Sequence, residues 1–412
     1  MTYKCAYSAA PGAANCLTCG KCCAGNFSIL DDFRVNNFTV SGLRNGYGVA
    51  ADIGTTTVVL ALLDLTSAKI IARHSFMNPQ RAYGPDVISR IHAANEGHLA
   101  ALRRLITESI ADGIDTLLKN SFIKKIDEIV IAGNTTMIHL LLGRSCGNLG
   151  VFPFKTDFTL EKKYLYADVF FSGSIRIDCS VKIIPWFAAF VGGDITAGLL
   201  YVLQNVTTLT AQLPKSDRSF LLIDLGTNGE MALYNKGKLI ITSTAAGPAF
   251  ENSARGHIVG ASGVIHELAQ LIRNEQIDET GLLKTAQGCF SQKEICDLQL
   301  AKSAVRTGLE ILLDSACMTH NDIEIVCLAG GIGQAIDVSD AAAIGLIPQE
   351  LICKTLAIGN SSLGGAVRAL LSHEDAEKDM QTLFSNFIEI NLAEHPRFND
   401  MFTENMFFIF CN

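Results

Sequence analysis

Two short glycine turns carry residue types that bind phosphate. The first reads DIGTTT, from Asp52 to Thr57, and the second reads DLGTNGE, from Asp224 to Glu230. Small residues let backbone N–H groups approach phosphate oxygens, and an aspartate at the end of a strand offers the hard oxygen ligands that suit Mg²⁺, usually through its waters. Either turn alone is equally compatible with an ordinary glycine-containing hairpin. The predicted phosphate-binding residues are Gly54, Thr55, Thr56, Thr57, Gly226, Thr227, Asn228 and Gly229.

A third aspartate and a further glycine turn belong to the same chemistry. Asp194 follows two glycines and opens an apolar helix, where its carboxylate is suited to hold Mg²⁺ or to orient an attacking water. The alternative role is a helix N-cap, which aspartate favours, and the two roles are compatible. The turn LAGGIG would let a base or ribose lie against the backbone. We therefore predict catalytic roles for Asp52, Asp194 and Asp224, and nucleotide contacts for Gly330, Gly331 and Gly333.

The elements that must position these residues occur twice in the same order. Each half is predicted to contain a strand that ends in Asp-x-Gly-Thr, a long amphipathic helix, and a buried strand that ends in Ala-Gly. The predicted helices are 99–118 and 295–312, and the Ala-Gly pairs begin at Ala132 and Ala329. An ordered repeat of this kind indicates duplication. We therefore expect an α/β protein of two duplicated halves with a nucleotide cleft between them.

Composition supports several buried cores and excludes some partners. The chain has 412 residues, of which 49% are apolar and 18% charged. A net charge of −8 argues against a nucleic-acid surface, and no window resembles a membrane helix or a signal peptide, so we expect a cytoplasmic protein without nucleic-acid or membrane partners. The predicted segments are 1–46 (cysteine-rich), 47–185 (first half), 186–372 (second half) and 373–412 (a tail that packs on the body).

Twelve of the thirteen cysteines fall into two groups. Seven are scattered and are expected to be small buried hydrophobic residues: Cys146, Cys179, Cys289, Cys296, Cys317, Cys327 and Cys353. Five lie within the first 23 residues and are predicted metal ligands: Cys5, Cys16, Cys19, Cys22 and Cys23. Their C-x2-C-x2-C run is typical of the start of a bacterial [4Fe–4S] site. Zinc, or a remnant that binds nothing, remains an alternative.

Longer stretches resemble known families. DIGTTT, DLGTNGE and LAGGIG resemble the two phosphate motifs and the adenosine motif of the superfamily of acetate and sugar kinases, heat-shock chaperones and actin, whose domains are ribonuclease-H-like. More specific stretches resemble the reductive activators of corrinoid proteins, from about residue 47 into the tail. These stretches are NPQRAYGPDVISRI (78–91), AGNTTMIHLLLG (132–143), AAGPAFE (245–251), LQLAKSAVRTGLEILL (298–313) and GNSSLGGA (359–366).

The resemblance implies an ATPase that drives the one-electron reduction of cob(II)amide to cob(I)amide in a corrinoid protein, with electrons carried on an N-terminal iron–sulfur centre. It implies ATP and Mg²⁺ as cofactors, a corrinoid protein or another metalloenzyme as partner, an electron donor such as ferredoxin, and a homodimer as one option. The [4Fe–4S] cluster is expected from the cysteine spacing and not from the family's usual pattern. The chain departs from the family's plant-type C-x5-C-x2-C spacing, since it retains only the Cys19–Cys22 core. The rival hypotheses are a small-molecule kinase, against which the cysteines argue, and a nucleotide-dependent binding protein without electron transfer.

Several other residues have both a functional and a structural interpretation. Asn78, Gln80, Asp86 and Arg90 either line the nucleotide cleft or serve as caps and turn residues. Pro248, Phe250 and Glu251 lie either at the mouth of the cleft or in a structural turn. His139 and His266 lie on apolar helical faces and are expected to be satisfied core or surface histidines.

Overall fold

The computed structural model describes residues 44–156, 162–170, 179–209, 217–226, 228–250, 261–284, 289–333 and 336–408. These residues form two compact units. The first unit comprises described residues up to 209 together with 361–386, and the second comprises 217–360 and 387–408. The sequence repeat predicted that the first half ends at residue 185. In the structure, the helices within 193–209 and 361–385 belong to the first compact unit, although they precede and follow the second unit's main segment in the sequence.

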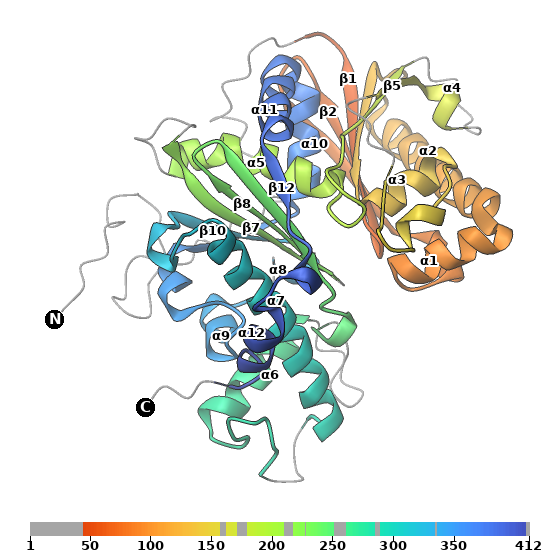
Figure 1. Ribbon diagram of the computed structural model, residues 1–412. Helices are drawn as coiled ribbons and strands as arrows, with labels where there is room; N and C mark the ends of the chain where they lie inside the picture. Colours follow the sequence, from red (N-terminus) through yellow and green to blue (C-terminus); the bar gives the residue numbers. More distant parts are fainter. Residues whose placement is uncertain are drawn as a thin grey trace. The chain divides into compact units, whose positions relative to one another are not determined.

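The first unit is built on a six-stranded mixed sheet in the order β3-β2-β1-β4-β6-β5. Figure 1 labels β1, β2 and β5 of this sheet. Strands β1, β2 and β3 are antiparallel neighbours, and β4 and β6 continue parallel to β1. The strands are β1 Tyr47–Ile53, β2 Thr57–Asp64, β3 Lys69–Met77, β4 Glu128–Gly133, β5 Lys162–Leu165 and β6 Ser180–Ile183. The helices are α1 Val87–Ala93, α2 Leu99–Ser121, α3 Thr135–Leu142, α4 Tyr166–Val169, α5 Gly193–Leu209, α10 Ser361–Leu371 and α11 His373–Ser385.

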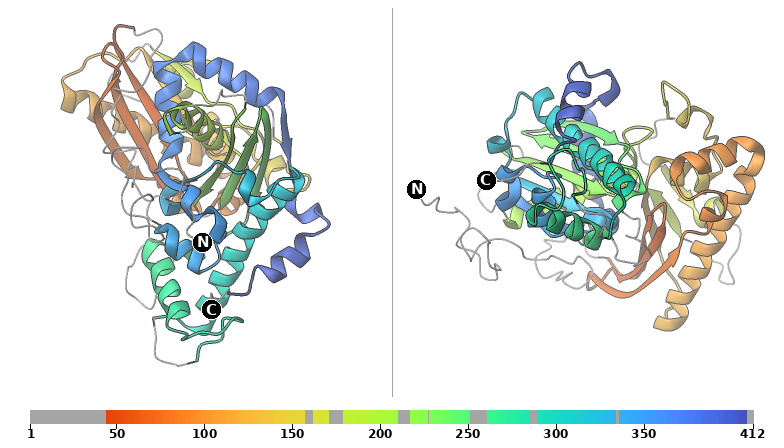
Figure 2. Two further views of the ribbon diagram at one scale, coloured as in Figure 1. Left: turned by 90° about the vertical axis from the view of Figure 1, so that its left-hand side faces the viewer. Right: turned by 90° about the horizontal axis from the view of Figure 1, so that it is seen from below.

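The second unit repeats this plan in a sheet of order β11-β10-β7-β8-β9-β12. The strands are β7 Ser219–Leu225, β8 Gly229–Asn235, β9 Lys238–Thr244, β10 Ile325–Ala329, β11 Thr355–Gly359 and β12 Phe387–Glu389. The helices are α6 Ala261–Arg273, α7 Gln292–Ser315, α8 Gly330–Gly333, α9 Val338–Ala343 and α12 Phe398–Glu404. Both views in Figure 2 show α7 alongside the strands of this sheet, as they show α2 alongside β2 and β3 in the first unit.

The predicted duplication is confirmed by strand order and register. The series β3-β2-β1-β4-β6 corresponds strand by strand to β9-β8-β7-β10-β11, with two antiparallel pairs followed by two parallel pairs. Asp52 of β1 is paired with Ala132 of β4, and Asp224 of β7 is paired with Ala329 of β10. The Asp-x-Gly-Thr and Ala-Gly signals therefore meet at the same end of each sheet.

Apolar side chains at helical spacing hold each long helix on its sheet. On α2 the buried positions include Leu102, Ile106, Ile110 and Ile114, as the spacing predicted. On α7 they include Leu298, Ala301, Val305 and Leu309. Each helix extends its predicted range by a few residues, and each contributes to the core of its own unit. Among the described residues no helix is both long and apolar enough to cross a membrane.

Helix α10 packs on α5 at backbone distance. A Cβ atom at Gly365 would lie 1.8 Å from the Ala197 carbonyl oxygen, and one at Gly364 would lie 2.6 Å from the Tyr201 ring. Only glycine permits such an approach. The buried Arg368 adds hydrogen bonds to the Leu200 carbonyl of α5 and to Asp379 of α11. These contacts explain why α5, α10 and α11 belong to one compact unit.

The C-terminal residues divide between the units. In the first unit Phe384 of α11 stacks on Phe187, with ring centroids 4.3 Å apart. In the second, β12 pairs with β9, and buried polar side chains of α7 bind the backbone that follows. Lys302 Nζ donates to the Phe407 carbonyl at 2.6 Å, and Gln299 Nε2 donates to the Met406 carbonyl at 3.1 Å. The described part of the tail therefore packs on folded elements.

The expectation that all seven scattered cysteines are buried is wrong for three of them. Cys146, Cys179 and Cys327 are buried and Cys289 is half-buried, but Cys296, Cys317 and Cys353 are exposed. Cys296 falls on the solvent side of α7, and Cys317 occupies a positive-φ position after it ends. An apolar neighbourhood in the sequence does not determine which face of a helix or turn a residue occupies.

Candidate functional site

The first predicted phosphate turn lies between β1 and β2. Asp52 is the penultimate residue of β1, and Gly54 N donates to the Thr57 carbonyl at 3.1 Å to close the turn. A Cβ atom at Gly54 would lie 2.6 Å from that same carbonyl oxygen, so the turn requires glycine. Thr56 and Thr57 are exposed and Thr55 is half-buried. The turn therefore presents its threonines to the surface of the first unit.

Three consecutive carbonyls of this turn accept hydrogen bonds from one side. Asn78 Nδ2 donates to Gly54 O at 2.9 Å, and Asn78 N donates to Thr56 O at 2.9 Å. Arg90 Nη2 donates to Thr55 O at 2.7 Å. In a trans peptide the C=O of one residue and the N–H of the next point in opposite directions. The N–H groups of Thr55 and Thr56 therefore point away from Asn78 and Arg90, as a phosphate-binding turn requires.

The stretch 78–91 serves as the support for this turn. Asn78, Gln80 and Arg90 are each fully buried. Gln80 Nε2 donates to the Leu102 carbonyl at 3.0 Å and so anchors the stretch to α2, while Asp86 caps α1 in a reciprocal capping box with Ser89. Burial lowers the pKa of Arg90 to about 10, and it remains charged at neutral pH. The capping interpretation is correct for Asp86 and also for Asn78, whose Oδ1 accepts from Gln80 N at 3.0 Å. Asn78 and Arg90 in addition hold the turn itself.

Two of the three predicted catalytic aspartates interact within the first unit. Burial, and next the charge of Asp52, raise the pKa of Asp194 to about 7. Ser362 Oγ of α10 donates to Asp52 Oδ1 at 2.7 Å. Like charges held close together favour a cation between them or protonation of one carboxyl group. This pair of hard oxygen donors fits a divalent cation such as Mg²⁺.

Asp194 lies inside the first turn of α5 and not at its cap. Thr196 N donates to the Gly192 carbonyl at 3.3 Å, which assigns the cap position to Gly192. The Asp194 carboxylate accepts from its neighbour Ile195 N at 2.9 Å. A Cβ atom at Gly192 would lie 2.5 Å from the Asn134 Cα atom, so the helix start packs directly on the end of β4. The N-cap alternative for Asp194 is therefore wrong.

Asn134 links the turn to this helix start. Its Nδ2 donates to Thr55 Oγ1 at 3.0 Å, and its Oδ1 accepts from Met137 N and caps α3. The adjacent Thr135 Oγ1 donates to the Ala188 carbonyl at 2.6 Å. Ser362 and Asn134 are thus site residues that the sequence prediction missed. Both lie in stretches whose family resemblance was recognised, GNSSLGGA and AGNTTMIHLLLG, and that resemblance was the available signal.

The second unit gathers the remaining predicted residues at one end of its sheet. Gly226 N donates to the Asn228 carbonyl at 2.9 Å and closes the turn after Asp224. Gly330 has φ +85°, and a Cβ atom there would lie 2.3 Å from Asp224 Oδ1. Gly331 is exposed with open space around it, whereas Gly333 packs against Leu328 and Gly229 packs against Thr244. Of the predicted contact residues, Gly330 therefore lies directly against Asp224, while Gly229 and Gly333 face the interior.

Several predicted positions lie outside the described residues: Cys5, Cys16, Cys19, Cys22, Cys23, Thr227 and Glu251. Within the described ranges no group of three or more histidine, cysteine or acidic side chains is arranged to hold a metal ion. Phe250 is a core residue. His139 is buried, with Nδ1 2.9 Å from the Ser145 carbonyl, and the exposed His266 pairs with the buried Asp340 at 2.7 Å, so both are satisfied as expected.

Comparisons with known proteins agree with this geometry. A family model described as the RACo middle region matches residues 47–204, and one described as the C-terminal domain of RACo, the ASKHA domain, matches 218–257 and 284–411. The corrinoid activation enzyme RamQ of Eubacterium limosum is 31% identical over 92% of this chain and 74% of its own length. The [Co(II) methylated amine-specific corrinoid protein] reductase of Methanosarcina barkeri is 21% identical over 79% of this chain and 70% of its own. A solved reductive activator for a corrinoid, iron–sulfur protein superposes with a TM-score of 0.74 at 30% identity, covering 89% of this chain and 67% of that one.

Proposed function

We propose a function from one premise: the chain belongs to the family of reductive activators of corrinoid proteins. It hydrolyses ATP and couples this reaction to the reduction of a corrinoid protein whose cobalt has been oxidised to the Co(II) state. One electron converts Co(II) to Co(I), while ATP and water yield ADP and phosphate. The observation that carries the proposal is the orientation of the Gly54–Thr56 turn beside the Asp52–Asp194 pair.

The first unit supplies phosphate and cation ligands. The N–H groups of Thr55 and Thr56, turned outward by Asn78 and Arg90, are suited to bind phosphate oxygens. Asp52 and Asp194 would hold Mg²⁺, which neutralises phosphate charge when bound. Ser362 fixes the rotamer of Asp52 by its hydrogen bond to Oδ1. Asp194, with a pKa of about 7 in the absence of a cation, is suited to orient the attacking water.

The second unit supplies a second turn and a glycine-lined backbone. Asp224, Gly226 and Asn228 would form a second phosphate turn, which is closed by the hydrogen bond from Gly226 N to the Asn228 carbonyl. The exposed Gly331 follows the positive-φ Gly330 and offers uncovered backbone for a ribose or base. We assign nucleotide binding to both units because the same strand pairing occurs in each. Asp52 is paired with Ala132 and Asp224 with Ala329, and a glycine follows each alanine.

Electron transfer is assigned to the cysteine-rich segment. Cys5, Cys16, Cys19 and either Cys22 or Cys23 provide the four thiolates that a [4Fe–4S] cluster needs. The electrons would come from a low-potential donor such as ferredoxin, and the acceptor would be the corrinoid cofactor of the partner protein. These assignments depend on the family membership and on the cysteine spacing.

The test combines metal analysis with nucleotide turnover. Protein purified without oxygen should contain about four irons and an equivalent amount of sulfide per chain, with an EPR signal after reduction. Asp224→Asn should abolish ATP turnover, whereas Asp297→Asn, an exposed aspartate of the same unit, should leave it unchanged. Normal turnover in Asp224→Asn contradicts the nucleotide assignment. Turnover without any iron supports a nucleotide-dependent binding protein, and phosphoryl transfer to a small molecule supports a kinase.

A further inference from the structure

We infer that helix α10 mechanically connects the Asp52–Asp194 carboxylates to Arg44, the residue from which the cysteine-rich segment extends. The helix contacts a proposed cation ligand at its first turn and binds Arg44 at its last turn. Occupancy of the nucleotide site therefore alters the position of Arg44. The inference rests on the proposed function, because it assigns a consequence to nucleotide binding at those two carboxylates.

The near end of the connection is a direct contact. Ser362 lies in the first turn of α10, and its Oγ donates to Asp52 Oδ1 at 2.7 Å. A carboxylate that binds a cation or its waters redistributes its hydrogen bonds, so this donor must adjust when the cation arrives. The neighbouring Ser361 Oγ is buried but makes no hydrogen bond within the described structure, which provides a matched control one residue away.

The helix between the two ends has no room to deform. All eleven residues of α10 are buried, and Gly364 and Gly365 place its backbone against α5, whose first turn carries Asp194. Packed interiors respond by shifting between arrangements and not by continuous deformation. Eleven residues span about 16 Å at 1.5 Å per residue. Helices α5 and α10 are therefore expected to move together. Helix α5 carries the proposed cation ligand Asp194, and α10 carries Ser362, which donates to the other proposed ligand, Asp52.

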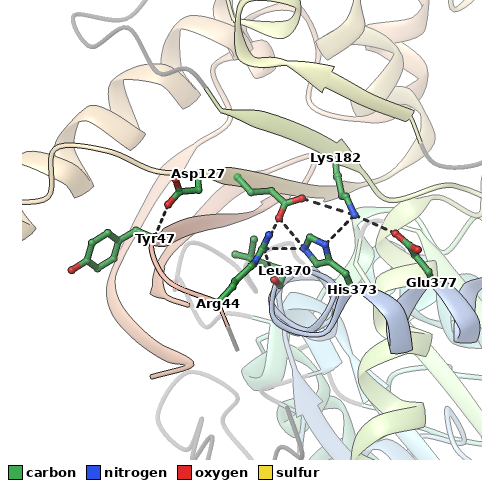
Figure 3. A network of polar contacts seen from close by, with 8 residues as sticks. Arg44, Tyr47, Asp127, Lys182, Leu370, His373 and Glu377 are labelled. Atoms are coloured by element: carbon green, nitrogen blue, oxygen red, sulfur yellow. Dashed lines mark hydrogen bonds and ion pairs between the residues drawn. The ribbon is translucent and has the colours of Figure 1, made fainter. Parts of the chain in front are cut away.

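The far end is a partly buried polar junction that contains Arg44 (Figure 3). Arg44 Nη2 donates to the Leu370 carbonyl in the last turn of α10 at 2.9 Å and to Glu128 Oε2 at 2.5 Å. His373, at the start of α11, brings Nε2 to 2.8 Å from the same Glu128 oxygen. Arg44 thus links the last turn of α10 to the first residue of β4.

The charges at this junction make it sensitive to displacement. The Glu128 side chain is only 2% exposed. Burial acts to raise the pKa of Glu128, but the hydrogen bonds from His373 and Arg44 outweigh it, and the pKa lies below its usual value. Lys182 completes the junction, with Nζ 3.3 Å from Glu377 and 3.3 Å from His373 Nδ1. A buried carboxylate that loses one of its partners is strongly destabilised. When Leu370 and His373 shift, Arg44 is therefore expected to move with them and keep its contact with Glu128.

The position of Arg44 in the chain gives this junction its functional meaning. The 43 residues before it contain all five clustered cysteines. Three residues after it, the chain enters β1 at Tyr47, and the other end of this strand carries Asp52. A shift of α10 on nucleotide binding would therefore change how the start of β1 is held, directly beside the segment that is proposed to carry electrons.

Hydrogen exchange with and without Mg²⁺–AMP-PNP tests the inference. In the wild-type protein the nucleotide should change exchange both in peptides covering 52–57 and in the distant peptides covering 44–48 and 370–376. Ser362→Ala, measured at a nucleotide concentration that saturates its site, should lose the response at the distant peptides, whereas Ser361→Ala should keep the responses at 52–57 and at the distant peptides. A response confined to 52–57 in the wild type overturns the connection but leaves nucleotide binding intact. No response anywhere overturns the proposed function itself.

The nucleotide affinity of a variant at Arg44 provides an independent test, which does not depend on whether a Ser362 variant folds. Because coupling between two sites is reciprocal, Arg44→Met should change the Kd for Mg²⁺–AMP-PNP by about fivefold or more. Lys125→Ala removes an exposed ion pair with Asp127 at 3.2 Å in the same unit and should leave the Kd unchanged. Equal Kd values for Arg44→Met and wild type contradict the inference.

Discussion

The carboxylate of Asp224 lies directly against the backbone of Gly330. The two residues come from neighbouring parallel strand ends, and a Cβ atom at position 330 would be 2.3 Å from Asp224 Oδ1 and 2.5 Å from the Leu225 carbonyl oxygen. The corresponding aspartate of the first unit, Asp52, has the same register with Ala132, which precedes Gly133. In the first unit a Cβ atom at Gly133 would lie 2.9 Å from the Ile53 carbonyl oxygen, so this glycine makes room for the backbone that follows Asp52.

Gly330→Ala should destabilise the second unit and weaken nucleotide binding. The residue would be forced into a positive-φ conformation and against Asp224, at a cost of about 1–3 kcal/mol in the free energy of unfolding. Denaturant unfolding without nucleotide measures this cost. Gly331→Ala is the control, because open space surrounds that position. If the two variants unfold alike, the close approach of Asp224 to Gly330 is incorrect.

Arg90→Met should disturb the first phosphate turn, because it removes the hydrogen bond that holds the Thr55 carbonyl. Arg90 is fully buried and donates to the Thr55 and Gly84 carbonyls, so its loss leaves buried acceptors unpaired. We expect the free energy of unfolding to fall by about 2–4 kcal/mol and the affinity for ATP to fall with it. Thermal unfolding and nucleotide titration measure the two effects. Arg81→Met, at an exposed position nine residues earlier, should change neither quantity; an equal loss in both variants would refute the supporting role.

Lys302→Met should remove part of the pH dependence of stability. Burial, with a smaller contribution from the charge of Arg306, lowers the pKa of Lys302 to about 7, while an unfolded lysine titrates near its usual value of about 10.4. Between these values the unfolded chain binds more protons, so the free energy of unfolding rises with pH. The rise from pH 7 to pH 9 should be about 2 kcal/mol larger in the wild type than in the variant.

Denaturant unfolding at pH 7 and pH 9 measures this difference. Lys293→Met changes an exposed lysine of the same helix and should keep the wild-type pH dependence. A Lys302→Met protein that retains the wild-type rise would show that Lys302 remains charged in the fold. Its hydrogen bond to the Phe407 carbonyl would then be the contact of a fully protonated ammonium group.

Glu128→Gln should destabilise the first unit at neutral pH and weaken its response to acid. The folded pKa of Glu128 lies below its usual value, so the stability it contributes is present at neutral pH and is lost as the pH falls below about 4.5 through the folded pKa. Glutamine keeps one oxygen acceptor but removes the buried negative charge that pairs with Arg44 and His373, at a cost of about 3 kcal/mol at pH 7. Urea unfolding from pH 7 to pH 3 provides the measurement. Glu377→Gln, whose side chain is 44% exposed, should cost less than about 1 kcal/mol, and an equal cost would contradict the junction.

The parts of the fold that were predictable are those encoded by neighbouring residues. The two Asp-x-Gly-Thr turns, the Ala-Gly strand ends and the helices at 99–118 and 295–312 each depend on residue spacing within one element, and their ordered repeat revealed the duplication. The local patterns also placed Asp52 and Asp224 at strand ends. The structure keeps all of these features.

The parts that were missed depend on contacts between distant residues. Ser362 and Asp52 are separated by 310 positions, and Arg44 reaches Leu370 across 326. No periodicity in a single segment reports such a pair. The exposure of Cys296, Cys317 and Cys353 was missed for a related reason, because a residue's face depends on what packs against the element and not only on its neighbours in the sequence.

The most direct measurement of the central claim is ATP-dependent reduction of a corrinoid protein prepared with its cobalt in the Co(II) state. The anaerobically purified chain, titanium(III) citrate as electron donor and either ATP or AMP-PNP are mixed with that protein, and Co(I) formation is followed by its visible spectrum. We predict Co(I) formation with the wild-type chain and ATP, none with AMP-PNP, and none with Asp224→Asn. Equal Co(I) formation with ATP and AMP-PNP, or by Asp224→Asn, would contradict an ATP-driven activator.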